Sequence, residues 1–272
     1  MAQVMDYLSS KSPLIQLEGL SKRFDKRGLH IDALSGINIS ICSGEFVAIL
    51  GPSGCGKSTL LNVIAGFDTP NSGLALFRGI PVSSPSPKRA VVFQEPALFP
   101  WLTVLDNIIF GPRMQGKSST EYMPRAERII QQVGLEKFAK HYPSELSGGM
   151  LQRVGIARVL VMDPEVLLMD EPFGALDAQT RTVMQELLLD VWERDHQTIV
   201  FITHDIEEAL LLADTVHVMT ARPGQIKKTI KVSLPRPRSA ELTTTPIFNS
   251  LKLEILRLIR EEAMQAAKDA VI

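Results

Sequence analysis

A glycine-rich stretch at residues 51–59, GPSGCGKST, has the spacing of a loop that binds phosphate groups. It fits the pattern G-x-x-x-x-G-K-[ST] and lies between an apolar run typical of a strand and a segment typical of a helix. The glycines let backbone N–H groups wrap a phosphate, Lys57 can reach the β- and γ-phosphates, and the Ser58 hydroxyl can bind Mg²⁺. An ordinary glycine-rich turn is the alternative, and it leaves the residues described next unexplained.

Three more short apolar runs are each followed at once by polar residues. Continuous, bounded runs of this kind are typical of strands buried on both faces of a parallel sheet. Ligands of such sheets bind beyond the carboxyl ends of the strands, so we expect these polar residues to converge on the phosphate-binding loop. The runs are AVVF (90–93) before Gln94, VLLM (166–169) before Asp170 and Glu171, and TIVFIT (198–203) before His204.

The residue types at these strand ends suit phosphate chemistry. Buried carboxylates are costly unless they are paired or bind a metal, so we expect Asp170 to hold Mg²⁺ through water. Glu171 is expected to polarise the attacking water as general base. Gln94 would bind Mg²⁺ or that water, and His204 would hydrogen-bond the γ-phosphate. Taken singly, solvated acids, a surface amide and a structural histidine are the alternatives.

A second phosphate-binding feature is predicted in ELSGGM, residues 145–150, which begins a segment with helical spacing of apolar residues. Gly148 and Gly149 each weaken a helix by about 1 kcal/mol relative to alanine. Ser147 before them is a typical N-cap residue. Free N–H groups and the helix dipole favour an anion here, and glycines let it approach the backbone closely.

The rest of the chain predicts the elements that position these residues. Alternating apolar and polar residues in LIQLEGLSKRF (14–24) and IDALSGINISICSGEF (31–46) predict antiparallel strands. The region 95–162 is expected to be mostly helical, with Thr103 capping one helix and another running over about 121–133. After the turn ARPGQI, a last strand would reach about Val232, and an amphipathic helix would follow LPRPRS. The predicted fold class is α/β, with a mostly parallel sheet, an N-terminal antiparallel β subdomain and a helical subdomain.

Composition limits the classes of function. The 272 residues carry a net charge of −1, which argues against a dedicated nucleic-acid binder. Two cysteines, Cys42 and Cys55, fit a reducing compartment. Residues 1–13 lack the pattern of a secretory signal, and no apolar run approaches the ~20 residues of a membrane span, so we expect a soluble, cytoplasmic protein. A solvated basic face is expected from Lys227, Lys228, Lys231, Arg236 and Arg238.

The whole set of motifs resembles an ATP-binding-cassette (ABC) transporter ATPase over nearly the full chain. Walker A (51–59), the Q-loop Gln94, the LSGGM signature, Walker B (VLLMDE), the D-loop GALD and the switch His204 occur in the family's order. The resemblance implies ATP hydrolysis with ATP and Mg²⁺. It also implies a RecA-like P-loop core made of two segments, residues 14–94, which include the antiparallel β subdomain, and residues 163–232. A helical signature subdomain would occupy residues 95–162, and a C-terminal helical extension would occupy residues 233–272.

A head-to-tail dimer follows from the same resemblance. Each ATP would be sandwiched between one subunit's phosphate loop and the other subunit's signature, so Ser147, Gly148 and Gly149 would bind the partner's γ-phosphate. Met150 replaces the family's glutamine, and no role is carried over to it. Asp177 alone is assigned from the D-loop, because Ala175 stands where many relatives have serine.

The resemblance also places Phe24 against the adenine ring, with a core phenylalanine as the alternative. Cys55 would contribute mainly its amide. Lys57, Gln94, Glu171 and His204 are the expected catalytic residues. The expected ATP-binding residues are Phe24, Gly51, Pro52, Ser53, Gly54, Cys55, Gly56, Lys57, Ser58 and Thr59, and the expected Mg²⁺ ligands are Ser58, Gln94 and Asp170.

Three strings, LFPWLTVLDNI, SGGM and LPRPRS, resemble the ATPases of nitrate, sulfonate and taurine importers. That family implies two such ATPases, expected here as a homodimer, on the cytoplasmic face of the inner membrane as peripheral subunits. Two permease subunits and an extracytoplasmic substrate-binding protein would complete the complex, and a permease helix would dock near Pro100 and Trp101. The function implied is ATP hydrolysis that powers import of a small anion such as nitrate, an aliphatic sulfonate or taurine.

Two other classes of protein are the alternatives. A non-transport ABC ATPase acting on nucleic acid or ribosomes would carry a coiled-coil insertion or a second cassette, and the chain has neither. A P-loop kinase or GTPase leaves the SGG helix and His204 unexplained. The transported solute itself is not encoded here, because no solute passes through this subunit.

Overall fold

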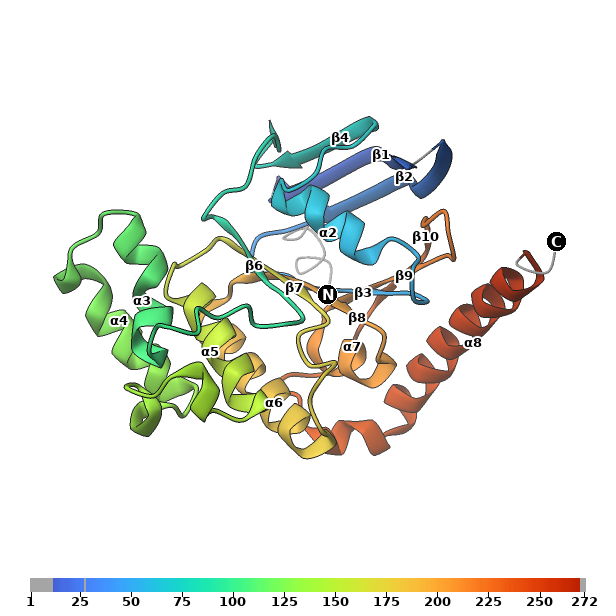
Figure 1. Ribbon diagram of the computed structural model, residues 1–272. Helices are drawn as coiled ribbons and strands as arrows, with labels where there is room; N and C mark the ends of the chain where they lie inside the picture. Colours follow the sequence, from blue (N-terminus) through green and yellow to red (C-terminus); the bar gives the residue numbers. More distant parts are fainter. Residues whose placement is uncertain (1–11, 27, 270–272) are drawn as a thin grey trace.

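Two β-sheets and a set of flanking helices form the molecule (Figure 1). The structure, a computed structural model, describes residues 12–26 and 28–269. Most of the segment in which we expect no secretory signal, residues 1–11, lies outside the described residues, as do the last three residues of the expected C-terminal extension. The strands are β1 (Ile15–Lys26), β2 (Leu29–Ile41), β3 (Phe46–Leu50), β4 (Ser72–Phe77), β5 (Ile80–Pro81), β6 (Arg89–Val92), β7 (Val166–Asp170), β8 (Thr198–Thr203), β9 (Thr215–Met219) and β10 (Ile226–Lys231).

The larger sheet has the order β10-β9-β3-β8-β7-β6, and all neighbouring pairs from β9 to β6 are parallel. Both of its faces are covered. In β3, Phe46, Ala48 and Leu50 pack into the hydrophobic core on the helical side, while Val47 and Ile49 pack into the core shared with α2 and the second sheet. Burial on both faces explains why these strands are continuous apolar runs, as predicted. The carboxyl ends of β3, β8, β7 and β6 therefore lie side by side.

The second sheet is antiparallel, with the order β2-β1-β4-β5. Its β1 and β2 pair over most of their length, from Ile15 opposite Ile41 to Lys26 opposite Leu29. One face carries buried residues such as Leu17 and the other is open, which accounts for the alternation read from the sequence. The α/β fold class, with a mostly parallel sheet and an antiparallel β subdomain, is confirmed.

The helices α3, α4 and α5 lie together at the left of Figure 1 and pack against one another. Thr103 caps α3 as predicted, because its Oγ1 accepts a hydrogen bond of 3.1 Å from the Asp106 amide. The helix predicted near 121–133 is α4, and Gly134 follows it with φ 67°. The helices are α2 (Lys57–Ala65), α3 (Val104–Met114), α4 (Ser119–Gln132), α5 (Gly148–Leu160), α6 (Ala178–Asp195), α7 (Ile206–Leu212) and α8 (Pro246–Asp269), with short 3₁₀ turns at Glu136–Phe138, Pro143–Glu145 and Ala240–Thr244.

The C-terminal part of the chain corrects one expectation. Arg238 does not belong to a solvated face: it is only 6 % exposed, and its guanidinium donates to the carbonyls of Leu210 and Ala213 at the end of α7. Burial lowers its pKa to about 10. Arg236 lies 3.9 Å from the ring centre of Trp192. Both arginines therefore dock the chain before α8 onto the core rather than facing water.

Helix α8 is amphipathic, as predicted. Phe248 and Ile255 are fully buried on one face, and α8 packs against α7 and β9. Within residues 12–26 and 28–269, no helix combines the length and the apolar character that crossing a bilayer requires.

Candidate nucleotide site

A cavity of about 570 Å³ opens at the carboxyl end of β3, where the phosphate-binding loop turns into α2. It draws residues from the antiparallel sheet, the loop, the end of β7 and the turn after β9. Seven of the ten expected ATP-binding residues line it, whereas Gly51, Pro52 and Cys55 do not. The lining residues are Phe24, Asp25, Ile31, Ala33, Ser53, Gly54, Gly56, Lys57, Ser58, Thr59, Glu171 and Arg222.

The loop at 51–59 folds tightly around the side chain of Lys57. The ammonium group is buried and donates hydrogen bonds to the carbonyls of Gly51 at 2.8 Å and Pro52 at 3.1 Å. Gly56 precedes α2 with φ 105°, and a Cβ there would lie 2.7 Å from the Ala33 carbonyl oxygen. Only glycine satisfies both conditions. The N-terminus of α2 therefore faces the cavity with a cation beside it, the arrangement that binds phosphate.

Cys55 faces away from the cavity, into the core. A Cβ on Gly51 would lie 2.8 Å from the Cys55 Sγ, so the thiol occupies the space that the missing side chain leaves. The thiol is buried, and burial raises its pKa. An uncharged, enclosed thiol leaves only the backbone of Cys55 for the ligand.

Asp170 and Ser58 bring two oxygen atoms together beside the loop. Burial raises the pKa of Asp170, and the Ser58 hydroxyl, which hydrogen-bonds the carboxylate, opposes that rise. A partly buried carboxylate next to a hydroxyl is a donor set that suits Mg²⁺, which takes one or two protein oxygens plus water and phosphate. Gln94 is exposed, with its Nε2 3.5 Å from the point where a Cβ on Gly174 would stand.

Glu171 and His204 are in direct contact. The Nδ1 of His204 lies 3.1 Å from the Glu171 Oε2, and Glu171 lines the cavity. The backbone of Glu171 has φ 44°, a value that non-glycine residues seldom adopt, and its amide donates to the Ile202 carbonyl at 2.9 Å. The neighbouring strands β7 and β8 thus hold Glu171 in an unfavourable backbone conformation, with its side chain at the cavity wall.

Phe24 is 39 % exposed and lines the same cavity, which removes the alternative of a core phenylalanine. The ammonium of Lys22 lies 5.0 Å from the centre of its ring. A ring fixed by a cation on one side offers a flat apolar face to a planar ligand.

The signature residues lie elsewhere. Ser147 caps α5 through the Met150 amide at 3.4 Å, and Gly148 has open space where a side chain would stand. A Cβ on Gly149 would approach the Thr180 Cγ2 to 2.5 Å, so this glycine is required by packing against α6 within the same chain. Ser147, Gly148 and Gly149 are not among the residues that line the cavity.

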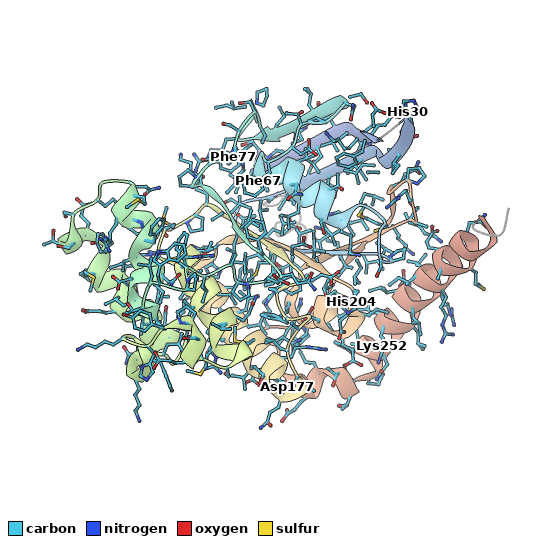
Figure 2. All side chains as sticks on the ribbon, in the orientation of Figure 1. His30, Phe67, Phe77, Asp177, His204 and Lys252 are labelled. Atoms are coloured by element: carbon cyan, nitrogen blue, oxygen red, sulfur yellow. The ribbon has the colours of Figure 1, made fainter. Side chains whose placement is uncertain are left out.

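Asp177 caps α6, with its carboxylate accepting from the Thr180 amide at 3.0 Å and the Thr180 hydroxyl at 2.7 Å. These hydrogen bonds lower the pKa of Asp177. Figure 2 labels Asp177 at the N-terminus of α6 and His204 beyond the end of β8.

Four residues that line the cavity were not predicted from the sequence: Asp25, Ile31, Ala33 and Arg222. Arg222, in the turn after β9, donates to the Gly54 carbonyl through Nε at 3.3 Å and Nη2 at 3.1 Å. The segment ARPGQI, which contains Arg222, predicts only a turn. No sequence motif indicates that an isolated arginine in such a turn belongs to a nucleotide site.

Comparison with known proteins decides the family. The ABC transporter family model matches residues 34–174, which include the phosphate loop, Gln94, the signature and the acidic pair. The chain belongs to the ABC transporter ATPases. An aliphatic sulfonates import ATP-binding protein of Bacillus cereus, SsuB, is 44 % identical over 89 % of this chain and 94 % of its own length. A taurine import ATP-binding protein of Jannaschia sp., TauB, is 43 % identical over 90 % and 93 %.

A solved structure agrees with this ABC fold. The dimeric, post-hydrolysis state of the cassette MJ0796, bound to ADP and Pi, superimposes with a TM-score of 0.71 and 33 % identity. It covers 81 % of this chain and 100 % of the solved one. The chain is accordingly an ATP-binding subunit and an ATPase, as the sequence predicts.

Proposed function

We propose that this ATPase powers an importer for a small anion, with taurine and other aliphatic sulfonates or nitrate as the solutes to test. The similarity to SsuB and TauB supports the solute class. The contact between Glu171 and His204 at the wall of the cavity carries the hydrolytic part of the proposal, because a carboxylate in that position supports the assignment of Glu171 as the base.

In the proposed reaction, Glu171 accepts a proton from water as the water oxygen attacks the γ-phosphorus. The bond from that phosphorus to the bridging oxygen of ADP breaks, and its electron pair leaves with ADP. His204 holds Glu171 through Nδ1, and its Nε2 remains for the γ-phosphate.

Lys57 and the amides at the start of α2 are assigned to the β- and γ-phosphates. Ser58 and Asp170, with Gln94, are assigned to Mg²⁺, which supplies positive charge to the transferred phosphoryl group when it is bound. Phe24 is assigned to the adenine ring.

The signature is proposed to serve the ATP of a second copy of the chain, in a head-to-tail homodimer. Ser147 and Gly148 are exposed, and neither lines the cavity of its own subunit, which supports action across an interface. Asp177 is proposed to approach the same interface from the start of α6. Because Gly149 is needed for contact with Thr180, Ser147 and Gly148 are the residues most free to meet the partner's nucleotide.

The proposed partners are two permease subunits and an extracytoplasmic substrate-binding protein, with the ATPase held on the cytoplasmic face of the inner membrane and no role for nucleic acid. Trp101 is 70 % exposed, with its ring centre 5.6 Å from that of Phe99, so it is not a core residue. An exposed tryptophan beside a half-buried phenylalanine, next to the Gln94 loop, suits the docking of a permease helix.

Glu171→Gln tests the hydrolytic assignment. The amide keeps the shape and removes the base, so the variant is expected to bind ATP and to accumulate as an ATP-bound dimer in size-exclusion chromatography with Mg²⁺. A monomeric variant with normal turnover would contradict the assignment. For the solute, a thermal-shift screen of the partner binding protein should give taurine, another sulfonate or nitrate as its ligand, and a protein that binds only sugars would refute the anion proposal.

A further inference from the structure

The turn between β9 and β10 reaches into the nucleotide cavity. Its Arg222 lines the cavity together with Gly54 and Lys57. Both Nε and Nη2 of Arg222 donate to the carbonyl oxygen of Gly54, which stands in the loop with φ 76°. A two-point contact from a planar guanidinium restricts that carbonyl more than a single donor would.

Hydrogen bonds within the turn and to β2 hold its backbone. Thr220 and Gln225 close it, since the Thr220 amide donates to the Gln225 carbonyl and the Gln225 amide donates to the Thr220 hydroxyl, each at 2.9 Å. Gly224 joins it to β2, because its amide donates to the Ala33 carbonyl at 2.9 Å. A Cβ on Gly224 would stand 2.2 Å from the Cys55 carbonyl oxygen. The turn is therefore pressed against the phosphate loop by its backbone as well as by Arg222.

The C-terminal helix holds the same turn from the other side. One oxygen of Glu262 accepts from the Ala221 amide at 2.9 Å, and the other accepts from the Lys227 ammonium at 2.7 Å. Glu261 also accepts from Lys227 at 2.7 Å. Glu262 thus contacts the residue directly before Arg222, whereas the hydrogen bond of Glu261 is to Lys227.

We infer that Arg222 is a positioning residue of the nucleotide site and that α8 holds it in place through Glu262. A continuous set of contacts runs from Glu262 through Ala221 and Arg222 to Gly54. Arg222 fixes the loop for phosphate binding by restraining Gly54 and keeps a positive charge at the cavity wall. This inference rests on the proposed assignment of residues 51–59 to ATP.

Arg222→Met tests the first part. It keeps an unbranched side chain and removes the guanidinium with both N–H donors, so KM for ATP should rise about five- to tenfold while kcat stays within about twofold. Hydrogen exchange of the amides in residues 51–59 should become faster. Arg222→Lys restores the charge but not the paired donors, and its KM should fall between those of the wild type and Arg222→Met.

Glu262→Ala and Glu261→Ala form a matched pair for the second part. Both remove a partner of Lys227, but only Glu262→Ala frees the Ala221 amide. Glu262→Ala should raise KM for ATP about two- to fourfold, and Glu261→Ala should not change it. In the Arg222→Met background the Glu262→Ala change should add little, because both variants break one set of contacts.

Unchanged KM and unchanged exchange of the loop in Arg222→Met would overturn the role of Arg222. Equal effects of the two glutamate variants would overturn the role of α8. Lys57→Ala distinguishes a wrong role for Arg222 or α8 from a wrong assignment of the nucleotide site. This variant should lose ATP binding. If it bound ATP like the wild type, the assignment of residues 51–59 to ATP would be wrong.

Discussion

The burial of His217 predicts that the protein becomes less stable as the pH falls. It stands in the middle of β9, is 5 % exposed, and its Nδ1 contacts the Thr229 hydroxyl at 2.8 Å. Burial lowers its pKa to about 4, with Glu45 opposing that fall and Lys231 adding to it. The folded protein therefore keeps this imidazole neutral where the unfolded chain protonates it.

The sign follows from the two pKa values. A group whose pKa is lower in the folded state binds fewer protons there, so stability is lost as the pH falls from the unfolded pKa of about 6.5 towards 4. Between pH 7 and pH 5 the contribution of this one residue to the free energy of unfolding should fall by roughly 1–2 kcal/mol. The glutamine of His217→Gln can still contact Thr229 but cannot be protonated in this range. Between pH 7 and pH 5 the free energy of unfolding of this variant should therefore fall by roughly 1–2 kcal/mol less than that of the wild type.

Urea unfolding followed by tryptophan fluorescence at pH 7 and pH 5 measures the difference. His30→Gln is the control for the replacement itself, because the His30 side chain is exposed. If His217→Gln and the wild type lost equal stability over this range, the reasoning from burial would be refuted.

Two further substitutions follow from contacts at the site. Gly149→Ala would bring a methyl group to 2.5 Å from the Thr180 Cγ2 and should destabilise the fold by about 1–3 kcal/mol in thermal unfolding. Adding Thr180→Ser, which removes Cγ2 but keeps the hydroxyl for Asp177, should restore most of that loss, and no restoration would show that the clash is not the cause. Phe24→Ala should weaken ATP binding roughly tenfold by calorimetry, since it removes the aromatic face, while equal affinity would rule out adenine stacking.

The sequence predicts the core sheet because burial on both faces leaves a pattern. The runs 46–50 and 198–203 coincide with β3 and β8, and the polar residues after them converge because parallel strands end at one edge. In contrast, β9 is fully buried yet contains Thr215 and His217, which interrupt its apolar run. Their partners, such as the Glu45 carboxylate 2.6 Å from the Thr215 hydroxyl, come from distant segments and leave no local signal.

Long-range packing also explains the other differences. Arg238 lies in a basic stretch that is typical of a solvated face, but the free carbonyls at the end of α7 draw it into the core. Gly149 is predicted as an opening for an anion, and the fold adds a second reason, the close approach of Thr180. Arg222 joins the nucleotide cavity because the turn after β9 is held by β2 and α8, neither of which is near it in the sequence.

The central claim is that each ATP site is shared by the phosphate loop of one subunit and the signature of another. Lys57→Ala disables the phosphate loop and Ser147→Arg blocks the signature, so neither variant alone should trap nucleotide or dimerise with ATP. In a mixed dimer, the intact loop of the Ser147→Arg subunit faces the intact signature of the Lys57→Ala subunit. Nucleotide trapping should therefore recover in the mixture, and its absence in a mixture shown by cross-linking to contain mixed dimers would contradict the shared site.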